Sequence, residues 1–472
     1  MTEPHDPARP DDGGDGLPPE IAALFRNLTG GDLDPQAAEM LKGMGLGSVD
    51  PKMLEMVMGQ VQAMFSAPDT GTAVNATVAM DTAHQVLTAD GGAAISEADS
   101  RAVADAVSVA DLWLDPVTEI RGSAPRGVAW TPAEWVAATM PLWCDLAEPV
   151  AAGVSGAVST ALTAQLEALG DGELTAEAFP PGMLPPGADP KQLFGQLGPM
   201  LQRLNGSMFS LQLGQGVGAL GSDVLTGNEV SLPLVAHPQV ALLPASIATF
   251  ADGLATDLAQ VRLYLAVREV ARARLFGGVP WLASQVTAAV QDYARDITID
   301  TEAIEEGVRS IDPSDPEAVA SALQGRLFAP TPSAAQKAAL ARLETLLALI
   351  EGWVDVVTDR ATSHQLPQSA ALGEAVRRRR ASGGPAEKTF AALVGLELRP
   401  RRLRDAANLF AALESAGGPA ARDGAWEHPD VAPTAADLDD PLGYVERIGT
   451  NGTDDLDAEL EALLRGDGSP EA

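Results

Sequence analysis

The sequence predicts a mostly α-helical protein whose main body is one large multi-helix domain. Hydrophobic residues make up 46% of the 472 residues, which is enough for a sizeable core. Aromatic residues contribute only 4%, whereas alanine and leucine, which favour helices over strands, are abundant. Apolar residues also recur at helical spacing through long segments that begin with capping residues.

We expect three regions along the chain. Residues 1–72 start with a stretch rich in Pro, Gly and Asp and continue with many methionines, so this acidic N-terminal region is expected to be partly disordered. A Met-rich segment can also bind a partner protein. Residues 73–445 carry the helical domain, and residues 446–472 form an acidic tail with one short amphipathic helix. Both ends are expected to be flexible.

The charge of the chain argues against a nucleic-acid partner. The formal net charge is -34 and the isoelectric point is near 4.3. A protein this acidic lacks the broad basic surface that is needed to neutralise phosphates. Two basic clusters occur, at Arg377 to Arg380 and at Arg399 to Arg404. In so acidic a chain we expect these arginines to pair with the protein's own carboxylates, and a local anion-binding patch is the alternative.

The sequence also predicts a cytoplasmic protein without membrane association. Cys144 is the single cysteine, which excludes an intramolecular disulfide and suits a reducing compartment. We interpret it as a small buried hydrophobe. The first residues lack a secretory signal, and no run of about 18 strongly apolar residues could cross a membrane.

Two helix starts are predicted in the first half. Ser96, followed by Glu97 and Asp99, is a capped start, and Thr131 with Glu134 has the spacing of a capping box. Both lead into segments whose tryptophans are candidate core residues, namely Trp113, Trp130, Trp135 and Trp143.

A Gly/Pro-rich run at 170–190 marks a loop or a boundary between helical subdomains. After it, Gly216 to Gly221 spell G-x-G-x-x-G, which in a dinucleotide site follows a β-branched strand. The preceding SMFSLQL is a poor strand, so we interpret these glycines as points of close helix approach. Residues 230–254 contain three prolines and are expected to be an irregular apolar segment.

The segment 257–282 predicts a central helix that carries charge where its pattern predicts apolar contact. Arg268 and Arg272 lie in the apolar stripe, and the opposite side is apolar as well, so the helix should be buried. A buried arginine needs a carboxylate partner. A purely structural ion pair, or a side chain that reaches to the surface, would also explain these arginines.

The spacing Arg268-Glu269-Val270-Ala271-Arg272 matches the zinc signature H-E-x-x-H with arginine at both histidine positions. In that signature two imidazoles on one helical face bind the metal, and the Glu deprotonates the bound water. Arginine has no lone pair for a metal. The bare pattern R-E-x-x-R occurs by chance in many helices.

A second informative helix is predicted at 333–359. One face carries four carboxylates at helical spacing, and the opposite face carries Leu, Ile, Val and Trp. These acids are Glu344, Glu351, Asp355 and Asp359. A solvated face and a functional one explain this pattern equally well. Further on, the chain is again helical to about 416, and residues 426–441 are expected to be irregular with His428 at the surface.

Several segments between about Asp81 and Tyr444 resemble the zincin-like metallopeptidase type 2 family. They are DLWLD (111–115), AEWV (133–136), VSLPL (230–234), LYLAVREVA (263–271), VPWL (279–282), LIEGWVD (349–355) and GGPAEKTFAALVGLELRPRRLR (383–404). Some members of this family are described as zinc-dependent proteases or hydrolases, and others are associated with deazaflavin coenzyme biosynthesis.

The resemblance implies roles for individual residues. Glu269 would be the general base and Glu351 the third zinc ligand, with Asp355 orienting that ligand. If no metal binds, Glu269 and Glu351 are vestigial in these roles. Arg268 and Arg272 stand where the family's metal-binding branch carries histidine. We therefore expect both arginines to fill the zinc cavity and to pair with Glu351, Asp355 and Glu269.

The resulting hypothesis is a catalytically impaired family member that does not bind zinc and acts as a pseudoenzyme or interaction protein, with an unknown protein partner. The alternative is an active metal-dependent peptidase with a non-standard ligand set that recruits His237 or His364. None of the five histidines lies at zinc spacing from another.

Overall fold

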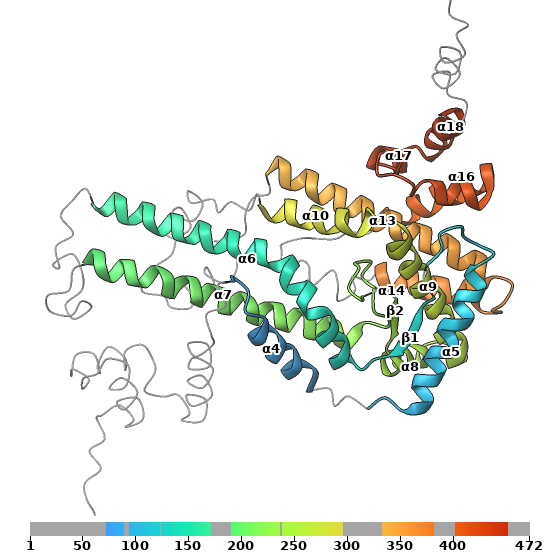
Figure 1. Ribbon diagram of the computed structural model, residues 1–472, viewed down its shortest axis with the longest axis horizontal. Helices are drawn as coiled ribbons and strands as arrows, with labels where there is room; N and C mark the ends of the chain where they lie inside the picture. Colours follow the sequence, from blue (N-terminus) through green and yellow to red (C-terminus); the bar gives the residue numbers. More distant parts are fainter. Residues whose placement is uncertain are drawn as a thin grey trace, which may run out of the picture. The chain divides into compact units, whose positions relative to one another are not determined.

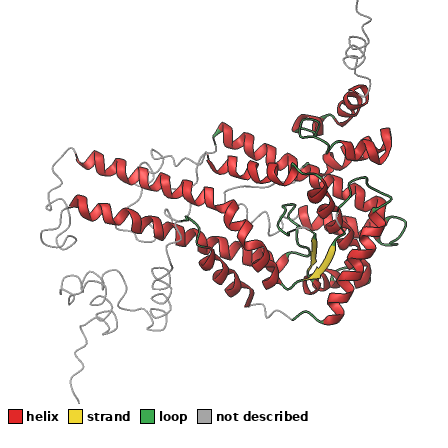
Figure 2. Ribbon diagram, viewed as in Figure 1, coloured by secondary structure: helices red, strands yellow, loops and turns green. Residues whose placement is uncertain are grey.

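A computed structural model of the chain describes residues 72–88, 94–122, 124–170, 190–236, 238–295, 333–381 and 402–451. These ranges contain twelve helices and two short strands, which confirms the mostly α-helical fold (Figures 1 and 2). The helices are α4 (Ala76–Thr88), α5 (Glu97–Leu114), α6 (Pro132–Gly170), α7 (Pro190–Asp223), α8 (Pro244–Asp252), α9 (Leu258–Gly278), α10 (Leu282–Arg295), α13 (Ala334–Thr362), α14 (Ser369–Ala381), α16 (Leu403–Gly424), α17 (Ala435–Asp439) and α18 (Pro441–Asn451).

The chain divides into two compact units, 1–69 with 168–198, and 70–167 with 199–472. In the first unit the described residues are the end of α6 and the beginning of α7. The second unit contains every residue discussed below. The Met-rich N-terminal stretch, the Gly/Pro-rich run 171–189 and the acidic tail after Asn451 lie outside the described residues.

Helix α9 is the central element that the sequence predicted. The Asp257 side chain caps it by accepting a hydrogen bond from the Ala259 amide. Every residue from Tyr264 to Leu275 is buried, because α9 packs against α5 on one side and α13 on another. A helix that is apolar nearly all round therefore lies inside the second unit, as expected.

Helix α13 packs against α9, α10 and α16. It begins at the expected position, where Ser333 and Gln336 form a reciprocal capping box. Its apolar side is buried, including Trp353 and Val357, which are 0% exposed. The carboxylate-bearing side faces α9 in its middle, where Glu351 is 3% exposed, and reaches solvent at Asp359.

The two helix starts predicted in the first half are confirmed. Ser96 accepts a hydrogen bond from the Asp99 amide, and Thr131 and Glu134 bond to each other's backbone amides. Of the four candidate tryptophans, Trp135 and Trp143 are buried, whereas Trp113 and Trp130 pack partly exposed at the edge of the core.

The glycines of α7 permit close helix contacts, as their interpretation required. A Cβ on Gly218 would lie 2.9 Å from the carbonyl oxygen of Ala83 in α4, and one on Gly221 would lie 2.9 Å from Cγ2 of Val136 in α6. Because G-x-G-x-x-G and the SMFSLQL segment before it both lie inside α7, it does not form the strand-to-helix turn of a dinucleotide site.

The expectation of an irregular segment at 230–254 was wrong. This segment contains strand β2 (Gln239–Leu242) and helix α8 (Pro244–Asp252), and β2 pairs in parallel with β1 (Arg126–Ala129). The prolines flank these elements, with Pro244 at the start of α8, where a missing N–H costs nothing. Residues 426–441 were also expected to be irregular, but they include α17 and the first residue of α18.

Candidate functional site

Helices α9 and α13 bring the predicted site residues together in one buried centre. Arg268 donates from Nη2 to Oε2 of Glu351 at 2.8 Å, and Arg272 donates from Nε to Oε1 of the same carboxylate at 2.7 Å. Arg268 also pairs through Nη1 with Asp355. Both arginines and Glu351 are at most 3% exposed. The ion pairs expected between the two helices are therefore present.

Glu269 lies in the same centre and is fully enclosed. It accepts hydrogen bonds from the Thr226 hydroxyl at 2.8 Å, the Asn228 amide at 2.6 Å and Nη1 of Arg272 at 2.9 Å. Gly227 allows this close approach, because a Cβ there would lie 2.5 Å from a methyl group of Val235. With both oxygens bonded and 0% exposure, Glu269 presents no oxygen to solvent.

A third arginine completes the centre. Arg380, in the last turn of α14, donates to Glu351 and to the backbone carbonyl of Glu229. Ser231 also donates its hydroxyl to Glu351, from a backbone position with φ of 63° that is rare for a non-glycine residue. One carboxylate thus receives three guanidinium groups and one hydroxyl. We call the set of Arg268, Arg272, Arg380, Glu269, Glu351 and Asp355 the arginine centre.

Sequence reasoning missed Arg380, Ser231, Thr226 and Asn228 as members of the site. Arg380 belonged to a run of four arginines for which only pairing with unspecified carboxylates was expected. The partners of its neighbours follow that expectation, since Arg377 pairs with Glu374 and Arg379 pairs with Asp223. No local pattern distinguishes the one arginine of the run that points inward.

The charges of the arginine centre balance, with three guanidinium groups against three carboxylates. Burial disfavours the Glu351 carboxylate, but the charges of Arg272, Arg380 and Arg268 outweigh it and hold its pKa well below the ordinary value. Burial likewise opposes the charge of Arg268, yet Asp355 and Glu351 raise the pKa of this guanidinium.

Two further groups of the centre shift in the direction that burial dictates. Burial raises the pKa of Glu269 even though Arg272 and the Thr226 hydroxyl favour its charged form. Burial, together with the nearby charges of Arg268 and Arg272, lowers the pKa of Arg380 against the attraction of Glu351. The arginines therefore favour the ionised form of Glu351, whereas burial favours the protonated form of Glu269.

The other candidate residues lie elsewhere. Asp359, His364 and His428 are exposed, and His428 lies 3.3 Å from Asp430 at the surface, as expected. His237 falls outside the described residues. Cys144 is half-buried at the edge of the core, where burial raises the pKa of its thiol to about 11. A thiol with this pKa is a poor nucleophile near neutral pH.

The residues at the arginine centre do not fit a zinc ion. Zinc needs lone pairs from imidazole, thiolate or carboxylate, and guanidinium supplies none. The carboxylates that could contribute are already hydrogen-bonded to arginines. Within the described part of the chain, no group of three His, Cys, Asp or Glu side chains has the arrangement of a metal site. Nor is any described helix long and apolar enough to span a membrane.

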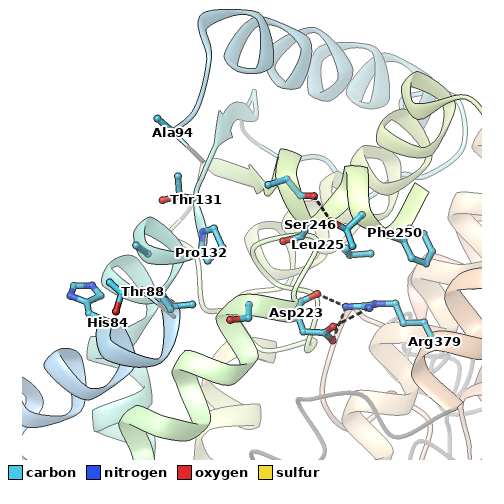
Figure 3. A pocket seen from close by; sticks show the side chains of 15 residues that line it. His84, Thr88, Ala94, Thr131, Pro132, Asp223, Leu225, Ser246, Phe250 and Arg379 are labelled. Carbon is cyan, nitrogen blue, oxygen red and sulfur yellow. Dashed lines mark hydrogen bonds and ion pairs between the residues drawn. The ribbon is translucent and has the colours of Figure 1, made fainter. Parts of the chain in front are cut away.

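A separate cavity of about 940 Å³ lies away from the arginine centre (Figure 3). His84 of α4, Pro132 of α6 and Phe250 of α8 line it, and Arg379 of α14 forms one wall. Arg379 pairs with Asp223 at 2.9 Å and lies over the Phe250 ring. None of the site residues predicted from the sequence lines this cavity.

Comparisons with known proteins agree with the fold. The model of a family described as zincin-like metallopeptidase matches residues 74–445. No curated protein matches the sequence. Among solved structures, a proposed hydrolase with a novel fold from Chloroflexus aurantiacus has a TM-score of 0.53 and 15% identity, over 80% of this chain and 99% of its own. At this identity the likeness concerns the fold alone.

Proposed function

The chain belongs to the zincin-like metallopeptidase family, and we propose that this member keeps the family's fold, has lost zinc-dependent hydrolysis and acts as an interaction protein. This family, with a hydrolase among the structural neighbours, supports a general peptidase or hydrolase ancestry. The sequence resemblance, between about Asp81 and Tyr444, assigned the chain to this family over nearly the same range as the family model.

One observation carries the loss of catalysis. Glu351, the residue at the third-ligand position, is bonded to Arg268, Arg272 and Arg380 and is 3% exposed. A ligand carboxylate must offer a lone pair to the metal, but both oxygens of Glu351 already accept from guanidinium groups. Replacing a doubly charged cation by arginines preserves the charge balance of the buried carboxylates and removes the water-activating ion.

The position of Glu269 supports the same proposal. A general base must reach the proton that it removes, directly or through one water. Glu269 instead bonds to Thr226, Asn228 and Arg272 and is 0% exposed. Its carboxylate therefore stabilises the packing of α9 against the loop after α7, which is a structural role.

An interaction role rests on the sequence. The Met-rich N-terminal stretch and the acidic ends have the composition of partner-binding segments. The alternative of an active peptidase with a non-standard ligand set needs a further donor near Glu351. Of the histidines considered for it, His364 is exposed on the turn after α13 and His237 lies outside the described residues.

The test is the zinc-to-protein ratio of the purified, tag-free chain after expression with added zinc, measured by elemental mass spectrometry. We expect a ratio near zero and no peptidase activity above a buffer blank. A ratio near one would overturn the proposal, and substitution of Glu351 and of each histidine in turn would then locate the ligands.

A gain-of-binding variant sharpens this test. The double variant R268H/R272H restores the zinc signature, but Arg380 still forms an ion pair with the Glu351 carboxylate. We therefore expect little zinc uptake by the double variant and about one zinc per chain in R268H/R272H/R380Q, because only the triple variant removes every guanidinium group from Glu351. R268H/R272H/R378Q is the matched control, since Arg378 is exposed. Failure of the folded triple variant to bind zinc would contradict the inferred descent from a zinc site.

A further inference from the structure

Next to the arginine centre lies a cavity of about 740 Å³ that no role has yet been given. Residues of α9, α13, α14 and α16 line it, among them four arginines, Arg268, Arg377, Arg380 and Arg404. The cavity meets the centre at Arg268 and Asp355. Its volume is that of a site for a small molecule rather than for a folded partner.

The lining has more cationic than anionic groups. Four guanidinium groups face three carboxylates, Asp355, Glu374 and Asp405. Each carboxylate has a structural counterpart. Asp355 pairs with Arg268, Glu374 with Arg377, and Asp405 lies in the first turn of α16, where the helix dipole favours a negative charge. The fourth carboxylate, Glu351, lies behind the lining and pairs with Arg380, so Arg404 is the lining arginine that no carboxylate of the described ranges neutralises.

Arg404 is the cation without a counterpart. Within the described ranges it has no ion pair or hydrogen bond, and it is exposed. It also lies in the first turn of α16, where the dipole disfavours a positive charge, and the Arg402 side chain does not cap this helix. The positive end of α16 and the Arg404 guanidinium thus act on the same space, which makes the cavity mouth attractive to an anion.

Arg377 offers donors to the cavity, and Arg268 adds positive charge behind it. Arg377 is 53% exposed and is held loosely, at 3.3 Å from Glu374 and 3.5 Å from Asp355. Arg268, although only 1% exposed, has an Nε–H without a hydrogen-bond partner in the described structure. This Nε–H is enclosed by protein atoms, so Arg268 contributes positive charge behind the cavity rather than a direct contact to a ligand.

We propose that this cavity binds a small molecule through an oxyanion, a phosphate or a carboxylate group, held by Arg404 and Arg377. Guanidinium forks match both groups in geometry, with two parallel N–H to O bonds. The buried arginines behind them, Arg268 and Arg380, are fixed by the carboxylates of the centre and form a rigid floor. This site does not depend on the loss of zinc binding.

The experiment measures dissociation constants by isothermal titration calorimetry with two probes, inorganic phosphate and succinate, at constant ionic strength set with chloride. The probe that binds more tightly identifies the oxyanion class. The variants are Arg404→Gln and Arg377→Gln. Arg378→Gln is the matched control, because Arg378 is an exposed arginine on the same helix that does not line the cavity.

We expect each cavity variant to weaken binding of the preferred probe by about tenfold, since one charge-assisted hydrogen-bonded contact is removed. The Arg378→Gln control should bind like the unaltered chain. Equal binding by all four proteins, or no heat beyond that of chloride exchange for either probe, would overturn the proposal. Circular dichroism checks that the variants fold, and all the altered arginines are surface residues, so the comparison stays interpretable.

Discussion

At the scale of single residues, Glu351 is the acceptor on which the arginine centre depends. In Glu351→Gln, three buried guanidinium groups lose their common anion, and we expect the free energy of unfolding to fall by about 3–5 kcal/mol. Urea denaturation measures this change. Glu374→Gln is the control, because its side chain is 59% exposed and its pair with Arg377 lies within one helix, so about 0–1 kcal/mol is expected. Equal losses of unfolding free energy in both variants would show that burial does not increase the contribution of Glu351 to stability.

The same residue gives the stability a pH dependence of known sign. The pKa of Glu351 is depressed in the folded protein, so its stabilising effect is present above the unfolded value of about 4.5 and is lost as the pH falls through the folded value. The raised pKa of Glu269 acts in the opposite direction, because protonation of this buried carboxyl favours the folded state as the pH falls. We expect acid unfolding below about pH 4.5 to be shallower in Glu351→Gln than in the unaltered chain. An unchanged acid limb would argue against a depressed pKa at this position.

At the scale of helices, Gly352 sets the distance between α13 and α16. A Cβ there would lie 2.6 Å from Cβ of Ala406 and 2.7 Å from the backbone nitrogen of Ala407. Alanine gains about 1 kcal/mol in helix propensity over glycine, but overpacking against a rigid backbone costs about 1–3 kcal/mol. We expect Gly352→Ala to lower the midpoint of thermal unfolding. Gly156→Ala in α6 is the control and should raise it slightly, because no atom of the described residues, apart from the neighbouring backbone of α6, lies within 4 Å of the added Cβ.

The helices were predictable from the sequence because their ends are encoded locally. Ser96, Thr131 and Ser333 cap the helices that follow them, and apolar periodicity indicated which of their faces are buried. Strands β1 and β2 were missed because each has only four residues and pairs with a partner far along the chain. The two arginines of α9 and their carboxylates on α13 were found from spacing and resemblance. Arg380 was not, because its inward direction depends on where α14 packs.

At the scale of the whole molecule, the excess of 65 acidic over 31 basic residues opposes compaction. Salt should weaken this repulsion more than it weakens the buried ion pairs, which are shielded from solvent ions. We expect the midpoint of thermal unfolding to rise by a few degrees, roughly 2–5 °C, between about 10 mM and 200 mM sodium chloride. Sucrose at equal osmolality controls for non-electrostatic effects. A midpoint that falls with salt would mean that exposed ion pairs dominate the balance.

The parallel pairing of β1 with β2 has a consequence for the order of folding. Parallel strands need a crossover, and here the chain between them includes α6 and α7, so closing this loop costs entropy that nearby contacts do not repay early. β2 also holds the loop that carries Thr226 and Asn228, because Gly227 donates to the Ala241 carbonyl. Two partners of Glu269, Thr226 and Asn228, thus depend on the position of β2, whereas its bond to Arg272 lies within α9. We therefore expect the pairing of β1 with β2, and with it the enclosure of Glu269, to form late in folding.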